Sequence, residues 1–228
     1  INSEVEYNGA ILASEDVQKH EFYFNGERII PQINGYFVDK SIKTFALPVI
    51  KKGVNILTVK MQLSIRSNTE WCYILGDFGV KLDGSKKTIV KKRDKIGYAP
   101  LCMQDMPFYS GNITYENEIE TPECDMIVET SHYRGAAVKV YLDGRDCGYT
   151  ALAPNRVVIK NVSAGSHVLK LKLLGNRFNT FGALHNTVKS QTWHGPDEWR
   201  TTGNEWSYEY QLKDMGILSA PAVTIINK

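Results

Sequence analysis

The segment RVVIKNVSAGSHVLKLKLLGN, residues 156–176, contains the clearest strand pattern of the chain. From residue 168 to residue 173, valine or lysine alternates with leucine. This period of two places the leucines on one face of an extended strand, because successive side chains point to opposite faces. Ala164-Gly165 supplies a turn before this strand, and residues 156–162 form another apolar run before the turn. The segment therefore predicts β structure with one buried face.

Two dipeptides predict tight turns on either side of similar strands. AAVKVYLDGRDCGYT, residues 136–150, contains Asp143-Gly144, and EFYFNGERI, residues 21–29, contains Asn25-Gly26. Asn-Gly or Asp-Gly between alternating apolar runs is the strongest short-range signal of a β-hairpin. We therefore expect one hairpin at each dipeptide.

Period-two runs recur along most of the chain, and no segment predicts an amphipathic helix of useful length. Pro48 predicts an edge strand or a bulge in its run, Gly76-Asp77 predicts a bulge, and the lysines of KKTIVKKR predict an exposed edge strand. Many short strands separated by Gly and Asn/Asp turns indicate an all-β chain built from β-sandwiches. The further predicted strands are residues 44–50, 56–63, 70–82, 86–93, 113–120, 125–131, 205–212 and 218–226.

The two halves of the chain share an order of parts. Each contains a strand, an Asn/Asp-Gly turn, an intervening segment, a strand, a Gly turn and an amphipathic strand. The pattern fades between residues 91 and 107, so we predict two tandem jelly-roll-like β-sandwiches, residues 1–92 and 93–228. One large sandwich with similar strands recurring by chance is the alternative. The first copy is short, which predicts that it is truncated at its N-terminus or borrows an edge strand from elsewhere.

Composition narrows the class of protein. The 228 residues are 43% hydrophobic and 23% charged with a net charge of +2 and no concentrated basic face, which argues against a nucleic-acid partner. No apolar run reaches the ~18 residues that span a bilayer, so we expect no membrane partner. The four cysteines lack paired zinc-site spacing and predict free thiols, with one disulfide as the alternative in an oxidising compartment. The chain starts with Ile1, which predicts a processed product or an excised part of a longer chain.

The segment GNRFNTFGALHNTVKSQTWHGPDEWRTTGNEWSYEYQL, residues 175–212, is too aromatic for a linker and too irregular for a helix. Its tryptophans and polar side chains suit a sugar, which stacks its C–H faces on aromatic rings and pairs its hydroxyls with polar groups. The same residue types dominate protein interfaces and can also cap a sandwich core. We keep all three interpretations open. The candidate carbohydrate-binding residues are Asn179, His185, Trp193, His194, Trp199, Arg200, Asn204 and Trp206.

The residues of this sequence do not match the usual patterns of a catalytic site or a metal site. A glycosidase needs two carboxylates that flank the scissile bond. Asp197 and Glu198 are adjacent and would point apart in an extended segment, and Glu205 and Glu209 carry no sign of burial. His185, His194 and Asp197 match no usual zinc spacing. We therefore predict no catalytic residue, no metal ligand and no cofactor, although a structural calcium is common in such sandwiches and cannot be placed from the sequence.

These pieces resemble a known type of module. The series VKVYLDGRDCG, Pro154, the AGSH turn and LKLKLLGNRFNTFGALH resembles the sugar-binding-like jelly roll of glycoside hydrolase family 2, a galactose-binding-like fold. His167 stands where that pattern usually has Asn, whereas the first copy keeps Asn55. EWCYILGDF, FYSGNITYE, the N-x-x-G-x-x-H motif and GPDEW resemble the auxiliary β-sandwich region of large rhamnosidase-like bacterial glycosidases, and the resemblance covers residues 21–223.

The resemblance implies a supporting role in a larger enzyme. We expect a non-catalytic region of a bacterial glycoside hydrolase that docks to the catalytic domain of the same polypeptide. A carbohydrate-binding module for an oligosaccharide or polysaccharide, with its stacking site in residues 175–212, is the alternative. An extracellular or periplasmic location is favoured over a cytoplasmic one. Fold alone does not give function, so the site has to decide between these roles.

Overall fold

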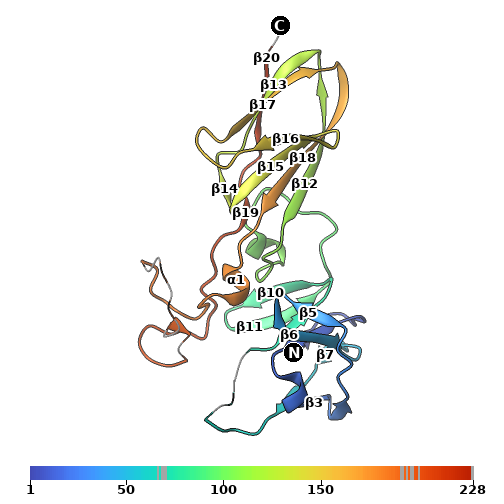
Figure 1. Cartoon of the computed structure of the whole chain (residues 1–228), viewed down its shortest axis with the longest axis vertical. Helices are drawn as coiled ribbons and strands as arrows, with labels where there is room; N and C mark the ends of the chain where they lie inside the picture. The colour runs from blue at the N-terminus through green and yellow to red at the C-terminus, as the bar shows by residue number, and fades with distance from the viewer. Residues whose placement is uncertain are drawn as a thin grey trace. The chain divides into compact units, whose positions relative to one another are not determined.

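The structure is a computed structural model that describes residues 1–65, 67, 71–190, 193, 195, 198, 199 and 201–226. The described chain is almost entirely β, which confirms the predicted fold class (Figure 1). Its contacts cluster into two compact units, which we call unit 1 (residues 1–92) and unit 2 (residues 93–228). The helices found in the described ranges are short: η1 (Val17–Lys19), η2 (Leu101–Gln104) and α1 (Phe178–Phe181). None of them has the length and hydropathy needed to cross a membrane.

Unit 1 contains three small sheets around one apolar core. The strand orders are β10-β11-β1-β7, β5-β6-β2-β9 and β4-β3-β8. Phe22 and Phe45 are fully buried in the core, and their rings meet edge to face at 5.0 Å. The strands are β1 (Asn2–Ser3), β2 (Ile11–Ser14), β3 (Glu21–Phe24), β4 (Glu27–Ile29), β5 (Gly35–Phe37), β6 (Asp39–Ala46), β7 (Gly53–Val54), β8 (Leu57–Lys60), β9 (Tyr73–Leu75), β10 (Gly79–Asp83) and β11 (Lys86–Val90).

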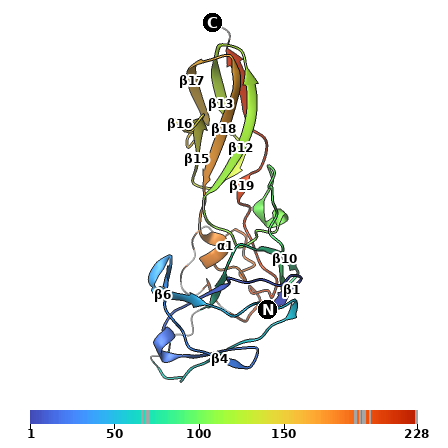
Figure 2. The ribbon, with the colours of Figure 1, turned by 90° about the vertical axis from the view of Figure 1, so that its right-hand side faces the viewer.

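Unit 2 contains a four-stranded sheet β12-β18-β15-β16, a three-stranded sheet β17-β13-β20 and the short pair β14-β19 (Figure 2). Met126 of β13 and Leu171 of β18 are fully buried in one core, which joins the two larger sheets as a sandwich. The leucines of the 168–173 run face this core, as their alternation predicts. The strands are β12 (Ile113–Thr121), β13 (Cys124–Glu129), β14 (Tyr133–Arg134), β15 (Ala137–Leu142), β16 (Arg145–Tyr149), β17 (Arg156–Val162), β18 (Gly165–Leu174), β19 (Gly216–Ile217) and β20 (Ala222–Ile226).

Both predicted hairpins are present. Asn25 and Gly26 have φ angles of 51° and 88° between β3 and β4, and Asp143 and Gly144 have 50° and 79° between β15 and β16. Positive φ at both central residues is the mark of the two-residue turn that matches the twist of antiparallel strands. Asn, Asp and Gly tolerate this region, which is why these dipeptides predicted the turns correctly.

The first strand of each hairpin pairs with a later strand on its other side in both units. In unit 1 the order is β4-β3-β8, and in unit 2 the order β16-β15-β18 lies within the larger sheet. Phe24 pairs with Leu57 in unit 1, and Leu142 pairs with Leu169 in unit 2. Each of these pairs lies immediately before the hairpin turn. The shared pairing gives a structural basis to the repeat that was read from the sequence.

A polar bridge repeats as well. In unit 1 the Asn25 Nδ2 donates to Asn55 Oδ1 at 3.1 Å, and Asn55 Nδ2 donates to the Lys51 carbonyl at 2.7 Å. In unit 2 the Nδ1 of His167 contacts the Asp143 carboxylate at 2.6 Å, and its Nε2 contacts the Ser163 carbonyl at 2.9 Å. In both units the bridging side chain thus joins the first turn residue to a backbone carbonyl. That carbonyl belongs to the residue four positions before the bridging residue.

Three local predictions were wrong. The run 86–93 is not an edge, since β11 lies between β10 and β1, and Thr88 pairs in parallel with Asn2. Gly76-Asp77 is not a bulge within one strand, since it separates β9 from β10, which belong to different sheets. Pro48 lies beyond the end of β6, at Ala46, so it marks neither an edge strand nor a bulge.

The predicted turn at Ala164-Gly165 lies between β17 and β18, which belong to different sheets. One further prediction was wrong. Residues 205–212 form no strand, and their β pairing with the described residues is limited to the isolated bridge of Asn186 with Trp206. The cysteines Cys72, Cys102, Cys124 and Cys147 all lie in the described ranges and are free, with only Cys124 fully buried.

Candidate functional site

The candidate site is the loop of residues 175–212, which we call the aromatic loop, and its two ends are tied together by α1. Asn179 is 5% exposed. Its Nδ2 donates to the Lys213 carbonyl at 2.8 Å, and the Lys213 N–H donates to its Oδ1 at 3.0 Å. Because the amide donates to and accepts from the backbone at the far end of the segment, Asn179 ties the two ends of the loop together.

A second set of bonds holds the two sides of the loop together. The Ser207 N–H donates to the His185 carbonyl at 2.9 Å, and the Thr187 N–H donates to the Glu205 carbonyl at 2.9 Å. The His185 Nδ1 lies 2.8 Å from the Ser207 carbonyl, so this nitrogen carries the proton and donates. The Gln211 N–H donates to the Leu184 carbonyl at 2.6 Å. The base of the aromatic loop is therefore an ordered unit rather than a flexible linker.

An aromatic cluster fills the space between these two sides. The His185 ring lies 4.7 Å from Tyr210 and 5.8 Å from Trp206. Tyr210 also meets Phe108 edge to face at 5.0 Å, and Trp206 meets Tyr208 at 4.3 Å. The Trp206 Nε1 is buried and has no hydrogen-bond partner among the described residues. Trp206 and His185 therefore act mainly as packing groups in this cluster.

Two other tryptophans of the loop face solvent. Trp193 is 75% exposed and Trp199 is 43% exposed. One side of the Trp193 indole rests on Gly195, since a Cβ at position 195 would lie 2.9 Å from its ring carbons. Tyr208 is 74% exposed although its ring also touches Trp206. Tryptophan and tyrosine are among the residue types that supply most of the binding energy at protein interfaces.

The predicted site residues thus separate into three groups. Asn179, His185 and Trp206 hold the loop together, and only His185 and Trp206 of this group contact each other. Trp193, Trp199 and Asn204 are exposed. His194 and Arg200 lie outside the described residues. Sequence reasoning missed Phe108, Tyr208 and Tyr210; the Trp-x-Tyr-x-Tyr spacing of residues 206–210 was the available signal, and it was read as a strand.

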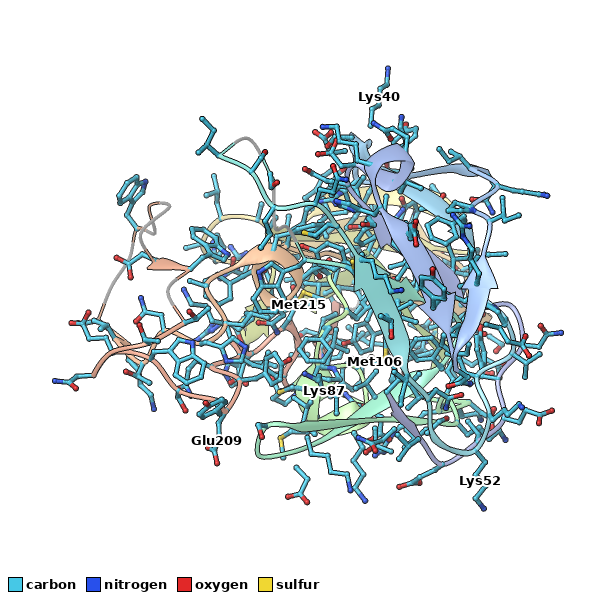
Figure 3. The ribbon with its side chains drawn as sticks, turned by 90° about the horizontal axis from the view of Figure 1, so that it is seen from below. Lys40, Lys52, Lys87, Met106, Glu209 and Met215 are labelled. Carbon is cyan, nitrogen blue, oxygen red and sulfur yellow. The ribbon has the colours of Figure 1, made fainter. Side chains whose placement is uncertain are left out.

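The acidic residues of the loop have different surroundings in the described structure. Glu198 accepts a hydrogen bond from the Asn186 side chain. Glu209 is exposed and points away from the ribbon (Figure 3), and the Glu205 side chain is also exposed. Asp197 lies outside the described residues. Within the described ranges, no three His, Cys, Asp or Glu side chains are placed to hold a metal ion.

Comparisons with known proteins found only distant structural similarity. The sequence matches no protein-family model, and a search of the curated proteins found no match. Among solved structures, a rhamnosidase from Novosphingobium sp. PP1Y aligns with 97% of this chain at 14% identity and a TM-score of 0.40. The chain spans only 22% of that rhamnosidase. The apo form of a Pleurotus ostreatus lectin aligns with 76% of this chain and 63% of its own length, at 13% identity and a TM-score of 0.25. Likenesses this low carry no functional argument.

Proposed function

We propose that this chain is a non-catalytic, galactose-binding-like β-sandwich region of a bacterial glycoside hydrolase, and that the aromatic loop docks to the catalytic domain of the same polypeptide. The observation that carries the proposal is the division of the loop into an ordered base and an exposed surface. His185, Trp206 and Tyr210 build the base, whereas Trp193 and Trp199 remain open to solvent. Aromatic anchors of this kind supply most of the binding energy at protein interfaces.

A pre-ordered base favours docking for a thermodynamic reason. Each rotamer-rich side chain that is immobilised on binding costs about 0.5–1.5 kcal/mol. The bonds from Asn179 to Lys213 and from His185 to Ser207 order the backbone before any partner arrives. Binding then has to order only the exposed rings. The loop therefore suits a permanent contact between domains of one polypeptide.

Oxidative footprinting of the tryptophans tests the docking role. In the isolated chain, hydroxyl radicals should oxidise Trp193 and Trp199, and in the full-length polypeptide both should be protected. Trp206 is the internal control, since its Nε1 is already buried in the isolated chain. Equal oxidation of Trp193 and Trp199 in both samples would exclude docking through this surface. Turnover of aryl glycosides by the isolated chain would exclude the non-catalytic role.

Carbohydrate binding is the second candidate, and the exposure of the Trp193 and Trp199 indoles favours it. A pyranose stacks its C–H face on such a ring, and neighbouring amides such as Asn204 supply polar contacts. The test is retention of the isolated chain on an immobilised polysaccharide. Retention of the wild-type chain together with loss of retention in Trp199→Ala would assign this role. Failure to bind any glycan on a broad array would leave docking as the function of the loop.

A further inference from the structure

The chain contains three Asn-Gly dipeptides, and all of them lie in unit 1: Asn8-Gly9, Asn25-Gly26 and Asn34-Gly35. Each dipeptide places a nucleophile beside an electrophile. The backbone nitrogen of the glycine can attack the side-chain carbonyl carbon Cγ of the asparagine, because glycine has no side chain to shield its nitrogen. The asparagine side chain has to rotate toward this nitrogen before a ring can close. The bonds that hold each side chain therefore decide how readily it reacts.

The Asn25 side chain is held through both ends of its amide. Its Nδ2 donates to Asn55 Oδ1 at 3.1 Å, and its Oδ1 accepts from the Ile56 N–H at 2.8 Å. The Asn25 N–H also donates to the Ile56 carbonyl at 2.8 Å. Rotation of the side chain toward the Gly26 nitrogen would break both side-chain bonds. The fold therefore protects this dipeptide.

The Asn34 side chain is held by one bond from a buried partner. Thr44 Oγ1 donates to Asn34 Oδ1 at 2.8 Å, and the Asn34 N–H donates to the Thr44 carbonyl at 2.9 Å. Thr44 is 7% exposed, so little water is at hand to replace the hydroxyl when the side chain rotates. Asn34 is therefore protected as well, although by one side-chain bond where Asn25 has two.

Asn8 has no such restraint. It is exposed, and neither its side chain nor the Gly9 N–H has a hydrogen-bond partner among the described residues. Space around the glycine is open as well, since a Cβ added at Gly9 would meet no atom within 4 Å apart from its chain neighbours. The side chain of Asn8 can therefore rotate toward the Gly9 nitrogen without breaking a bond to the described protein.

The backbone is paired on both sides of this free dipeptide. Before it, the Tyr7 N–H donates to the Ile50 carbonyl and the Ile50 N–H donates to the Tyr7 carbonyl, each at 2.9 Å. After it, the Leu47 N–H donates to the carbonyl of Ala10 at 2.8 Å, and Ala10 is fully buried. Residues 8 and 9 thus form a link of fixed length between two anchored positions.

We propose that Asn8 is a site of spontaneous deamidation, and that its conversion to isoaspartate destabilises unit 1. The Gly9 nitrogen loses its proton to solvent and bonds to Asn8 Cγ, the Cγ–Nδ2 bond breaks, and ammonia leaves. Water then opens the succinimide ring. Opening at the main-chain carbonyl of residue 8 gives isoaspartate, and opening at Cγ gives aspartate. One water is consumed for each ammonia released, and no group is oxidised or reduced.

Isoaspartate changes the length of the link. Its main chain passes through Cβ and Cγ of residue 8, which adds one backbone atom between Tyr7 and Ala10. The pair of Tyr7 with Ile50 and the bond from Leu47 to Ala10 can then no longer both keep their geometry. Tyr7 is also bound through its side chain, because its hydroxyl accepts from the Asp77 N–H at 2.6 Å. The modification therefore strains contacts that join three segments of unit 1, whatever the role of the aromatic loop.

Incubation of the whole chain in mildly alkaline buffer tests the site. Peptide mapping by mass spectrometry follows the amide-to-acid conversion at all three dipeptides, once in the folded chain and once in concentrated urea. Each folded rate is divided by the rate of the same dipeptide in urea, which removes the effect of the neighbouring sequence. We expect this ratio to be about tenfold higher for Asn8 than for Asn25, where two bonds must break, and about threefold higher than for Asn34, where one must break. Equal ratios, or a higher ratio at Asn25 or Asn34, would overturn the proposed site.

Hydrogen exchange after the same incubation tests the consequence, because it reports local loss of stability. Peptides that contain Ile50 or β2 should lose protection in the wild-type chain, whereas peptides from β18 in unit 2 should not. Asn8→Gln is the matched control, since it keeps an exposed amide but would have to close a larger ring, which forms far more slowly. It should retain its protection. Unchanged exchange in a wild-type chain that has been converted at Asn8 would show that the modification does not destabilise unit 1.

Discussion

The carboxylate of Asp143 and the imidazole of His167 form an ion pair at 2.6 Å, at the place where unit 1 has the neutral pair Asn25 and Asn55. Both ring nitrogens of His167 face acceptors, the Asp143 carboxylate and the Ser163 carbonyl. A neutral imidazole donates only once, whereas imidazolium donates twice. The arrangement therefore favours the charged ring. The bonds to Asp143 first and Ser163 second raise the pKa of His167, and the bonds from His167 and from the Val168 N–H lower the pKa of Asp143.

The first prediction is a pH dependence of unit 2 that comes from this pair. The contribution of His167 is fully present below its ordinary pKa of 6.5 and is lost as the pH rises through its raised value. The contribution of Asp143 is present above its ordinary pKa of 3.8 and is lost as the pH falls through its lowered value. The pair should therefore stabilise unit 2 most between those two ordinary values. The free energy of unfolding of unit 2 should therefore be higher at pH 5 than at pH 8.5. Urea unfolding followed by tryptophan fluorescence at both pH values measures this difference.

The double variant Asp143→Asn with His167→Asn is the matched control, because it copies the pair of unit 1. It should remove this pH dependence while the hydrogen-bonded bridge is kept. Three of the four tryptophans, Trp193, Trp199 and Trp206, lie in unit 2, so the fluorescence reports mainly on that unit. An unchanged difference between pH 5 and pH 8.5 in the double variant would show that other groups cause it.

The sequence predicted those features of the fold that depend on neighbouring residues. Asn25-Gly26 and Asp143-Gly144 specify their turns because few other residues tolerate positive φ. The position of β11 could not be predicted, because its second neighbour, β1, lies more than 80 residues away in the sequence, with Asn2 opposite Thr88. Pairing over such a distance is set by the packing of the whole unit and leaves no local pattern.

The candidate site was predictable in location but not in the roles of its residues. The aromatic content identified residues 175–212 correctly as an unusual segment. The alternation of residues 206–210 predicted a strand. Instead, Trp206 and Tyr210 pack against His185, Tyr210 also meets Phe108, and these residues form no sheet. The sequence could not show that the Asn179 amide is bonded to the Lys213 backbone.

The second prediction separates packing tryptophans from exposed ones. Trp206→Ala should lower the free energy of unfolding of unit 2 by about 1–3 kcal/mol, because the ring leaves a gap beside His185 and Tyr208. Trp193→Ala should change it by no more than about 0.5 kcal/mol, because the ring is mostly exposed. Denaturant unfolding of both variants measures the two values. Equal losses would mean that Trp193 also packs within the chain.

The third prediction concerns closure of the aromatic loop. Asn179→Ala removes both hydrogen bonds to the Lys213 backbone, and at about 0.5–1.5 kcal/mol for each bond the free energy of unfolding should fall by about 1–3 kcal/mol. Residues 185–210 should then be cleaved faster in limited proteolysis, because the two ends of the loop are no longer tied. Asn204→Ala is the control, since Asn204 is exposed. Loop cleavage that is no faster in Asn179→Ala than in this control would argue against closure by Asn179.

The last prediction tests the close approach of two backbone segments where the aromatic loop begins. A Cβ at position 175 would collide with the carbonyl oxygen of Gly111 and lie 2.9 Å from that of Ser110, and the Gly175 N–H donates to Asn112 Oδ1 at 3.2 Å. Backbone atoms cannot move aside as a flexible side chain can, so Gly175→Ala should destabilise unit 2 by about 1–3 kcal/mol. Gly97→Ala is the matched control, because the nearest atom to its added Cβ is 4.0 Å away and no positive φ is involved. A thermal unfolding midpoint that falls in Gly175→Ala and stays constant in Gly97→Ala would confirm the contact, whereas equal midpoints would contradict it.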